Sequence, residues 1–327
     1  MMKKSLLALS VAAAAMGAQA ADVQVYGLID TSLSFVSSDA DIAGHDRVNS
    51  FSMENAKEFG SRFGLKGSED LGNGMKVSFQ LENGFKADSG EFKTEGKLFD
   101  RQATVALSSD FGTLTMGRVG GVGSGAGFDL VYGYGDAFDG GDGDVFGFAT
   151  SDRYDNMVTY QTPKFAGLQA TVQYSFNEDS VNDKDREGSS AVNRYASAAL
   201  TGDFGALQTV LAYEFQNYKS FGADEHDDGQ IVYLGGNYDC GFAKTFVMGQ
   251  YFKGLAENPF AADAFEGHPV DGEGVKGYGA HVGTIVPVAG GDFTGGLYYV
   301  DSTVKNAEED ADGKYYGIAL KYEYPLS

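Results

Sequence analysis

The sequence is poor in cysteine, proline, tryptophan and histidine. Its 327 residues include one cysteine, five prolines, no tryptophan and four histidines. A lone cysteine, Cys240, excludes a framework of disulfides within the chain. The histidines, at positions 45, 226, 268 and 281, lie far apart in the sequence. They have neither the spacing of a metal cluster nor that of a nucleophile–base pair, so we expect no metal, no cofactor and no enzyme activity.

Basic residues and long hydrophobic runs are also scarce. Only 24 Lys and Arg residues stand against 46 Asp and Glu residues, which gives a formal net charge of −22. Such an acidic chain repels nucleic acid, so a nucleic-acid-binding protein is excluded. After residue 20 no stretch approaches the run of about 18 apolar residues that a membrane-spanning helix needs, so this class is excluded as well.

The first twenty residues have the organisation of a secretory signal peptide. Lys3 and Lys4 precede a short apolar run at 6–16, and an Ala-x-Ala pattern ends at Ala20. We therefore expect a signal peptide at 1–20, cleaved after Ala20, and a single domain at 21–327. Loss of the two lysines changes the formal net charge from −22 to −24.

Apolar and polar residues alternate with a period of two in many segments, for example at 76–82, 168–176 and 316–324. This period predicts β-strands that have one apolar and one polar face. Abundant glycine (47 residues) and aromatic residues (13%) agree with a strand-rich protein. Fourteen strands are expected, at 23–35, 59–67, 75–85, 98–107, 112–118, 153–162, 168–177, 192–201, 206–217, 230–238, 244–254, 274–286, 292–300 and 314–324.

The connections between these strands alternate between short and long. The short ones cover 68–74, 108–112, 163–167, 202–205, 239–243 and 287–291, and the long ones cover 37–58, 86–96, 119–152, 178–190, 220–229, 255–273 and 301–313. A soluble β-sandwich also shows alternation, but it has no reason to sort its loops in this way. The sequence therefore predicts an all-β fold, a transmembrane antiparallel β-barrel. Aromatic residues near strand ends are expected to form an interfacial girdle, at Tyr26, Tyr174, Phe176, Tyr213, Phe215, Tyr322 and Tyr324.

The long connection at 119–152 differs in composition from the others. It contains eleven glycines and six aspartates but no Lys or Arg. A segment of this length without periodicity is unusual inside a compact fold, and when it is ordered it is usually functional. We interpret this segment as a loop that folds into the lumen and narrows a channel. The alternative is a disordered surface linker.

Several motifs resemble those of the general trimeric porins of Gram-negative outer membranes. The clearest is GSRFGLKGSEDLG at 60–72, and YGLID at 26–30, RQATVAL at 101–107 and RYDN at 153–156 are similar to the family's first, fourth and sixth strands. The resemblance implies a sixteen-stranded barrel with its third loop in the lumen. It also implies a homotrimer in contact with outer-membrane lipid and lipopolysaccharide.

The resemblance further implies a pore constriction with arginines on the wall and acids on the loop. By motif the wall residues are Arg62, Arg101 and Arg153, and the loop residues are Asp136 as first choice and Asp139 as second. The strand period independently places Arg62 and Arg153 on a polar face. That face belongs to the lumen, because an arginine facing lipid costs about 2–4 kcal/mol at the bilayer midplane.

Two arginines fit the strand period less well. Arg101 shares its face with Val105 and Leu107, so a bulge is needed to turn it into the lumen. Arg118 shares its face with Met116 and is not among the first choices.

The chain also departs from the resemblance at its end. Family members finish in a strand with a terminal aromatic residue, whereas this sequence stops at YPLS (324–327). With fourteen strands instead of sixteen, we expect the last hairpin to be absent and the barrel domain to be C-terminally incomplete.

These observations together predict an outer-membrane porin, a passive diffusion channel for small hydrophilic solutes and ions. The acidic loops favour a weak preference for cations at low salt, and the arginines act in the opposite direction. The alternative is an exported non-channel β-protein, either an adhesin or receptor or a calcium-binding module. The last of these is suggested by Gly140–Asp144, which resembles one copy of a glycine–aspartate calcium repeat.

Overall fold

The computed structural model describes residues 22–38, 47–139, 151–177, 192–218, 227–256, 273–305 and 310–326. The expected signal peptide lies outside these residues. The strands are β1 (Asp22–Leu28), β2 (Thr31–Ser38), β3 (Val48–Asn55), β4 (Arg62–Gly72), β5 (Met75–Gly84), β6 (Gln102–Ser109), β7 (Gly112–Gly120), β8 (Arg153–Gln161), β9 (Leu168–Ser175), β10 (Arg194–Phe204), β11 (Leu207–Asn217), β12 (Gly229–Asp239), β13 (Lys244–Leu255), β14 (Val275–Val288), β15 (Gly291–Val304) and β16 (Ala311–Glu323). One short helix, α2 (Tyr132–Gly135), lies between β7 and β8.

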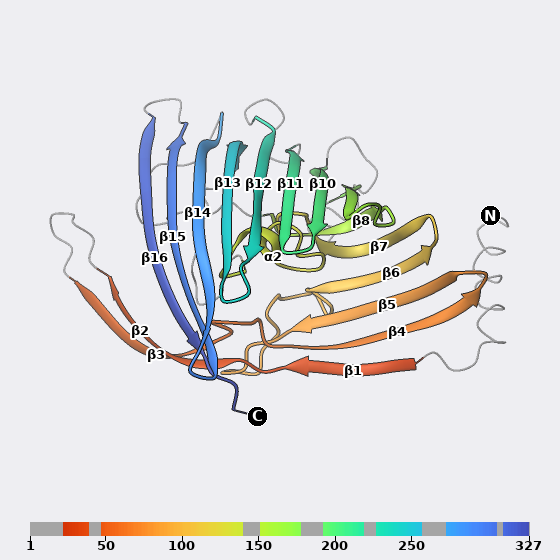
Figure 1. Cartoon of the computed structure of the whole chain (residues 1–327), viewed down its shortest axis with the longest axis horizontal. Helices are drawn as coiled ribbons and strands as arrows, with labels where there is room; N and C mark the ends of the chain where they lie inside the picture. The colour runs from red at the N-terminus through yellow and green to blue at the C-terminus, as the bar shows by residue number, and fades with distance from the viewer. Residues whose placement is uncertain are drawn as a thin grey trace.

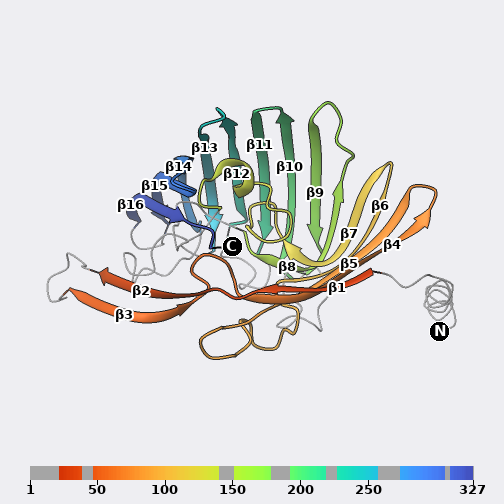
Figure 2. The ribbon, with the colours of Figure 1, turned by 60° about the horizontal axis from the view of Figure 1, so that its bottom comes forward.

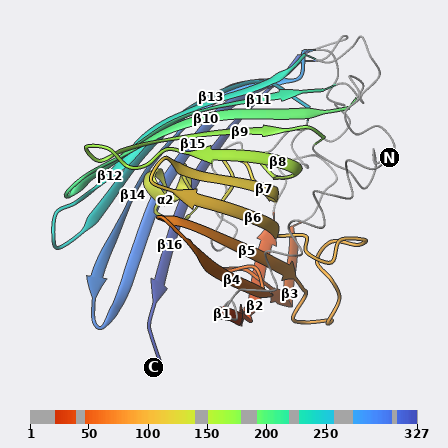
Figure 3. The ribbon, with the colours of Figure 1, turned by 90° about the vertical axis from the view of Figure 1, so that its right-hand side faces the viewer.

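Fourteen of these strands form one antiparallel sheet in the order β1-β4-β5-β6-β7-β8-β9-β10-β11-β12-β13-β14-β15-β16. From β4 onward each strand pairs with the next strand along the chain, and the sheet curves around α2 (Figures 1 and 2). The view from the side shows the same concave arrangement (Figure 3). The predicted all-β, antiparallel architecture is therefore confirmed.

The start of the chain differs from the expectation of a single strand at 23–35, which the structure divides into β1 and β2. The chain bends after Leu28, and β2 pairs with β3 in a separate ribbon that extends away from the large sheet (Figure 1). The bend is stabilised by Asp30, whose carboxylate accepts the backbone N–H groups of Glu58 and Phe59 at 2.8 and 2.6 Å. The assignment of 37–58 to a long loop is therefore wrong where β3 is concerned.

The two faces of the sheet carry the two halves of the sequence alternation. Apolar side chains on the outer face are exposed, as on β6, where Val105 keeps 50% of its surface accessible and the preceding Thr104 only 6%. The apolar face is therefore the one expected to meet lipid. Tyr26, expected in the aromatic girdle, faces inward instead. Its hydroxyl group donates to Glu82 Oε2 at 2.8 Å, because Glu82 and Gln80 of β5 share its side of the sheet.

The segment after β7 lies on the concave face (Figure 2). Its apolar side chains are almost completely buried, including Val122, Val131, Tyr132 and Phe138. They pack against the inner faces of β10 to β15 in one continuous apolar core. The predicted inward folding is confirmed for residues 119–139, and residues 140–150 lie outside the described part of the chain.

Strands β1 and β16 are the two ends of the sheet order, and the backbone pairings of the described residues do not join them. An ion pair between Lys321 of β16 and Glu58, which precedes β4, spans this region at 2.5 Å. Among the described residues, no helix has the length and apolar character required to cross a membrane.

Candidate functional site

Arg62 and Arg101 meet at one buried carboxylate. Arg62 is the first residue of β4, and its Nε lies 3.9 Å from Glu82 Oε2. Arg101 Nε donates to Glu82 Oε1 at 2.7 Å. Glycine at position 60 leaves space for the Arg101 side chain, since a Cβ atom at Gly60 would lie 2.6 Å from Arg101 Nη1.

The bulge expected at Arg101 is absent. Strand β6 begins at Gln102, and its register with β5 is regular from Gln102 to Ser108. Arg101 lies just before the strand, so the face shared by Val105 and Leu107 does not determine its direction. This is why the strand period is a poor guide to its orientation.

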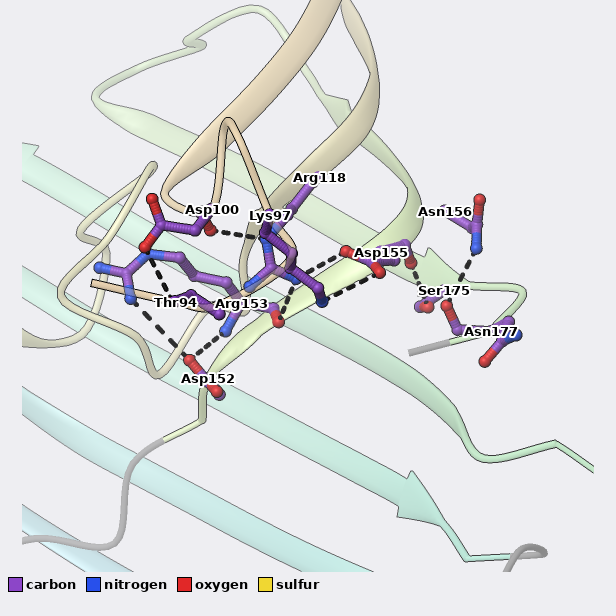
Figure 4. Close-up of polar contacts among 10 residues, drawn as sticks. All are labelled: Thr94, Lys97, Asp100, Arg118, Asp152, Arg153, Asp155, Asn156, Ser175 and Asn177. Atoms are coloured by element: carbon purple, nitrogen blue, oxygen red, sulfur yellow. Dashed lines mark hydrogen bonds and ion pairs between the residues drawn. The ribbon is translucent and has the colours of Figure 1, made fainter. Parts of the chain in front are cut away.

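Arg118 and Lys97 converge on Asp155 (Figure 4). Arg118 Nη1 donates to Asp155 Oδ1 at 2.6 Å, and Lys97 Nζ lies 3.2 Å from Asp155 Oδ2. Arg118 also donates to the backbone carbonyl oxygens of Asp100 and Arg153. Its side chain is therefore fixed by three acceptors.

The pairing of β7 with β8 is irregular beside Arg118. The register between β7 and β8 shifts between Gly117 and Val119, where two steps on β7 face three steps on β8. Gly117 adopts a φ of +130°, a conformation that side-chain-bearing residues rarely adopt. Beside this shift, Tyr154 of β8 is buried, and its ring stacks on that of Tyr195 at a centroid distance of 4.2 Å.

Arg153 completes the group of cations. Its Nη1 lies 3.9 Å from the exposed carboxylate of Asp152, beside Arg118 (Figure 4). Among the described residues we define the basic cluster as six cations, Arg62, Lys93, Lys97, Arg101, Arg118 and Arg153, together with four carboxylates, Glu82, Asp100, Asp152 and Asp155. The formal charge of the cluster is therefore +2 (6 − 4).

The two loop acids predicted for the constriction, Asp136 and Asp139, have contacts outside the basic cluster. Asp136 is buried, and its Oδ1 accepts from the Tyr298 hydroxyl at 2.6 Å and lies 3.3 Å from His281 Nε2. These partners belong to β14 and β15, the wall opposite the basic cluster. Asp139 shares a side-chain hydrogen bond with Asp129. The participation of Asp136 and Asp139 in a constriction stays a prediction.

A cavity of about 690 Å³ lies between the basic side of the sheet and the loop, which reaches it with Gly127 and Phe128. Its polar lining consists of Gln24, Lys66, Ser68, Ser78, Gln80, Gln102, Thr104 and Thr115. These residues come from β1, β4, β5, β6 and β7. Arg62 and Lys66 lie on one face of β4, four residues apart, so the cavity continues directly from the basic cluster along the strand.

A curved antiparallel sheet with an apolar outer face, a polar inner face and an inserted loop defines a pore-forming outer-membrane protein. The sequence profile of the Gram-negative porin family matches residues 6–327. The chain belongs to this family.

Relatives support the same assignment over most of the chain. The sequence is 34% identical to an outer membrane porin protein of Bordetella pertussis, with 100% of this chain and 91% of that protein aligned. It is also 34% identical to outer membrane porin protein 32 of Delftia acidovorans, over 77% of this chain and 70% of that protein. These names point to a channel of the outer membrane rather than to an enzyme.

Solved structures show the same fold. An anion-selective porin from Comamonas acidovorans superposes with a TM-score of 0.68 at 26% identity, covering 94% of this chain and 85% of that one. OmpF of Salmonella typhi superposes with a TM-score of 0.61 at 17% identity, covering 93% and 86%. The protein is therefore an outer-membrane porin with a transmembrane antiparallel β-barrel fold.

The sequence reasoning missed two features of the site. The first is Glu82, which contacts both Arg62 and Arg101. Its strand alternates clearly and places Glu82 on the polar face with Gln80, so a carboxylate facing the lumen could have been predicted. Arg118 was not among the first choices because of its strand period, and that period carries no information on its ion pair with Asp155 of β8. In the described residues, His, Cys, Asp and Glu side chains do not gather in groups of three suited to a metal ion.

Proposed function

We propose that the channel conducts small hydrophilic solutes and favours anions. The observation that carries this proposal is the basic cluster at one end of the polar cavity. Solutes that move along β4 pass from Arg62 to Lys66. In the described part of the chain, the residues that line the cavity include one cation and no carboxylate. A fixed positive potential in a narrow passage raises the local concentration of anions.

The loop offers less opposing charge than its composition suggests. Burial raises the pKa of the Asp129 carboxyl group, and the nearby charge of Asp136 raises it further. Asp136 is hydrogen-bonded to Tyr298 at the opposite wall. We therefore set aside the weak preference for cations that the acidic composition favours.

The constriction is proposed to lie between the basic cluster and the described part of the loop. Arg62, Arg101 and Arg153 act on its wall, joined by Arg118, while Asp136 and Asp139 hold the shape of the loop. Removal of residues 1–20 after export, assembly as a homotrimer, and contact with outer-membrane lipid and lipopolysaccharide are parts of the same proposal. We expect no catalytic activity, because the proposed channel only orients and filters solutes.

The test is the reversal potential of the purified protein in planar bilayers under a potassium chloride gradient. We expect a value of the sign that chloride permeation produces, larger at low salt because screening is weaker. A cation-selective value would overturn the proposed preference, and absence of channels would overturn the function itself. The relative from Comamonas acidovorans, described as anion-selective, is a suitable reference.

A further inference from the structure

A buried carboxylate on β11 has no part in the basic cluster. Glu214 faces the concave side of the sheet, and only 1% of its surface is exposed. The nearest described loop segment is the first turn after β7, at 121–124. Burying a charged group in this way is unfavourable unless its oxygen atoms receive hydrogen bonds.

Three donors reach the two oxygen atoms of Glu214. The backbone N–H of Gly123 donates to Oε1 at 2.9 Å, and the hydroxyl group of Tyr195 donates to the same atom at 2.5 Å. The hydroxyl group of Tyr233 donates to Oε2 at 3.0 Å. Tyr195 in turn accepts the backbone N–H of Val122 at 3.0 Å. One carboxylate therefore joins three strands, β10, β11 and β12, to the start of the loop.

The end of the loop is held at the same place. The backbone N–H of Ser151 donates to the carbonyl oxygen of Gly123 at 3.2 Å, and that of Gly121 donates to the carbonyl oxygen of Asp152 at 3.0 Å. The two ends of the inserted segment thus form one short ladder. Because Gly123 is bonded to both Ser151 and Glu214, Glu214 fixes the base of the whole segment.

The glycines of the loop fit this contact. A Cβ atom at Gly123 would lie 2.6 Å from Glu214 Oε2 and 2.5 Å from the Tyr233 hydroxyl, too close for either group to stay in place. At Gly125, two residues later, the nearest atom to an added Cβ would be the Asp139 carbonyl oxygen at an ordinary 3.4 Å. Neither glycine has a φ in the left-handed region. Gly123 is therefore required for close approach, whereas Gly125 is not.

We infer that Glu214 is a positioning residue that sets the width of the pore by fixing the base of the inserted loop against β10 to β12. The inference rests on the proposed function, since it assigns a control point to the same constriction. Glu214 does not line the described cavity. It acts on solutes only through the position of the loop.

The carboxylate chemistry predicts which substitution is tolerated. Gln can place its carbonyl oxygen where Gly123 and Tyr195 donate, and its amide can donate to the hydroxyl oxygen of Tyr233. Ala leaves the N–H of Gly123 without its acceptor and opens space under the loop. A release of the loop base should therefore follow E214A and G123A, and not E214Q or G125A.

The experiment compares single-channel conductance and reversal potential for the wild type and these four variants as full chains. Each is first checked for the heat-modifiable migration of a folded barrel on a gel. For E214A and G123A we expect conductance to rise roughly 1.5-fold or more, with weaker ion selectivity, because a wider pore separates ions less sharply. E214Q and G125A should match the wild type in both measurements.

The outcomes distinguish this inference from the proposed function. If the wild type forms no channels, the proposed function fails. If the wild type conducts and folded E214A and G123A keep its conductance and selectivity, the positioning role of Glu214 is refuted. Should E214A not fold, the comparison between G123A and G125A decides, because equal conductance in these two variants would also refute it.

Discussion

The concave face of the sheet has two halves that follow the same strand period but have different surroundings. The inner faces of β10 to β15 are covered by the loop and form a dry core with residues such as Ile231 and Met248. The inner faces of β1 and β4 to β7 line the polar cavity with residues such as Gln80 and Thr104. The described part of the loop thus separates the two halves, and we expect solutes to pass through the half that it leaves uncovered.

The difference teaches that an inward-facing position is not by itself a wet position. On β13, Phe246, Met248 and Phe252 face inward and are buried, although in an open pore they would meet water. Their apolar character is explained by Tyr132 and Phe138 of the loop, which belong to the same core. Burial of such aromatic side chains supplies the stability that holds the loop in place.

The largest effect is expected when the same charge is placed in both halves. M248D buries a carboxylate in the dry core and should cost more than about 5 kcal/mol, because the apolar side chains around Met248 do not compensate for the lost hydration of the charge. Q80D places the charge in the cavity, where water solvates it. Heat-modifiability of the folded barrel should be lost at a much lower temperature for M248D than for Q80D. Equal losses would mean that the two halves are equally wet.

The second-largest effect is expected when the attachment of the loop to the wall is weakened without adding charge. Phe138 is buried, and its ring lies 6.4 Å from that of Tyr298 and 5.7 Å from Lys321 Nζ. F138A should cost about 3–5 kcal/mol of packing free energy. We expect larger and more variable single-channel conductance. F165A, at an 83% exposed side chain in a turn, is the control and should leave the conductance unchanged.

The third effect in size, a change in ion selectivity, is expected when one cation of the basic cluster is removed. R101Q removes the cation at 2.7 Å from Glu82 and leaves that carboxylate to Arg62 and Tyr26. Loss of one charge at a partly screened site should lower the anion-to-cation permeability ratio roughly two- to threefold. Reversal potentials at low salt measure this ratio. An unchanged ratio would show that the cluster lies away from the conduction path.

The smallest effect is expected at Lys66, in the middle of the cavity. K66Q removes the cation that lines it, and we expect a lower anion conductance at low salt that disappears at high salt. K76Q removes the same charge from β5, at a position that does not line the cavity. A reduction of the same size in both variants would mean that Lys66 acts only through net charge.

Much of the fold was predictable because strand alternation and loop length are local signals. The period of two identified the fourteen paired strands, and glycine and aspartate content marked 119–152 as exceptional. The bend at Asp30 was not predictable, since it depends on backbone groups at Glu58 and Phe59, far along the chain. Long-range contacts of this kind leave no periodic trace.

The site was predictable only in part for the same reason. Arg62 stands in a regular strand, so its face could be read from its neighbours. The contacts of Arg118 depend on Asp155 of β8, and those of Asp136 depend on Tyr298 and His281, more than 140 residues away along the chain. Charge composition indicated a field but not which acids would be held at the wall.

The separation of the two halves is tested most directly by cysteine accessibility. Cys240 is the chain's only cysteine and is exposed, so C240S gives a clean background. Q80C then reports on the cavity and A212C on the dry core, where Ala212 is 1% exposed. A charged methanethiosulfonate reagent should reduce the bilayer current of Q80C and leave that of A212C unchanged. Block of A212C at the same rate as Q80C, or no block of either variant, would contradict the division of the lumen by the loop.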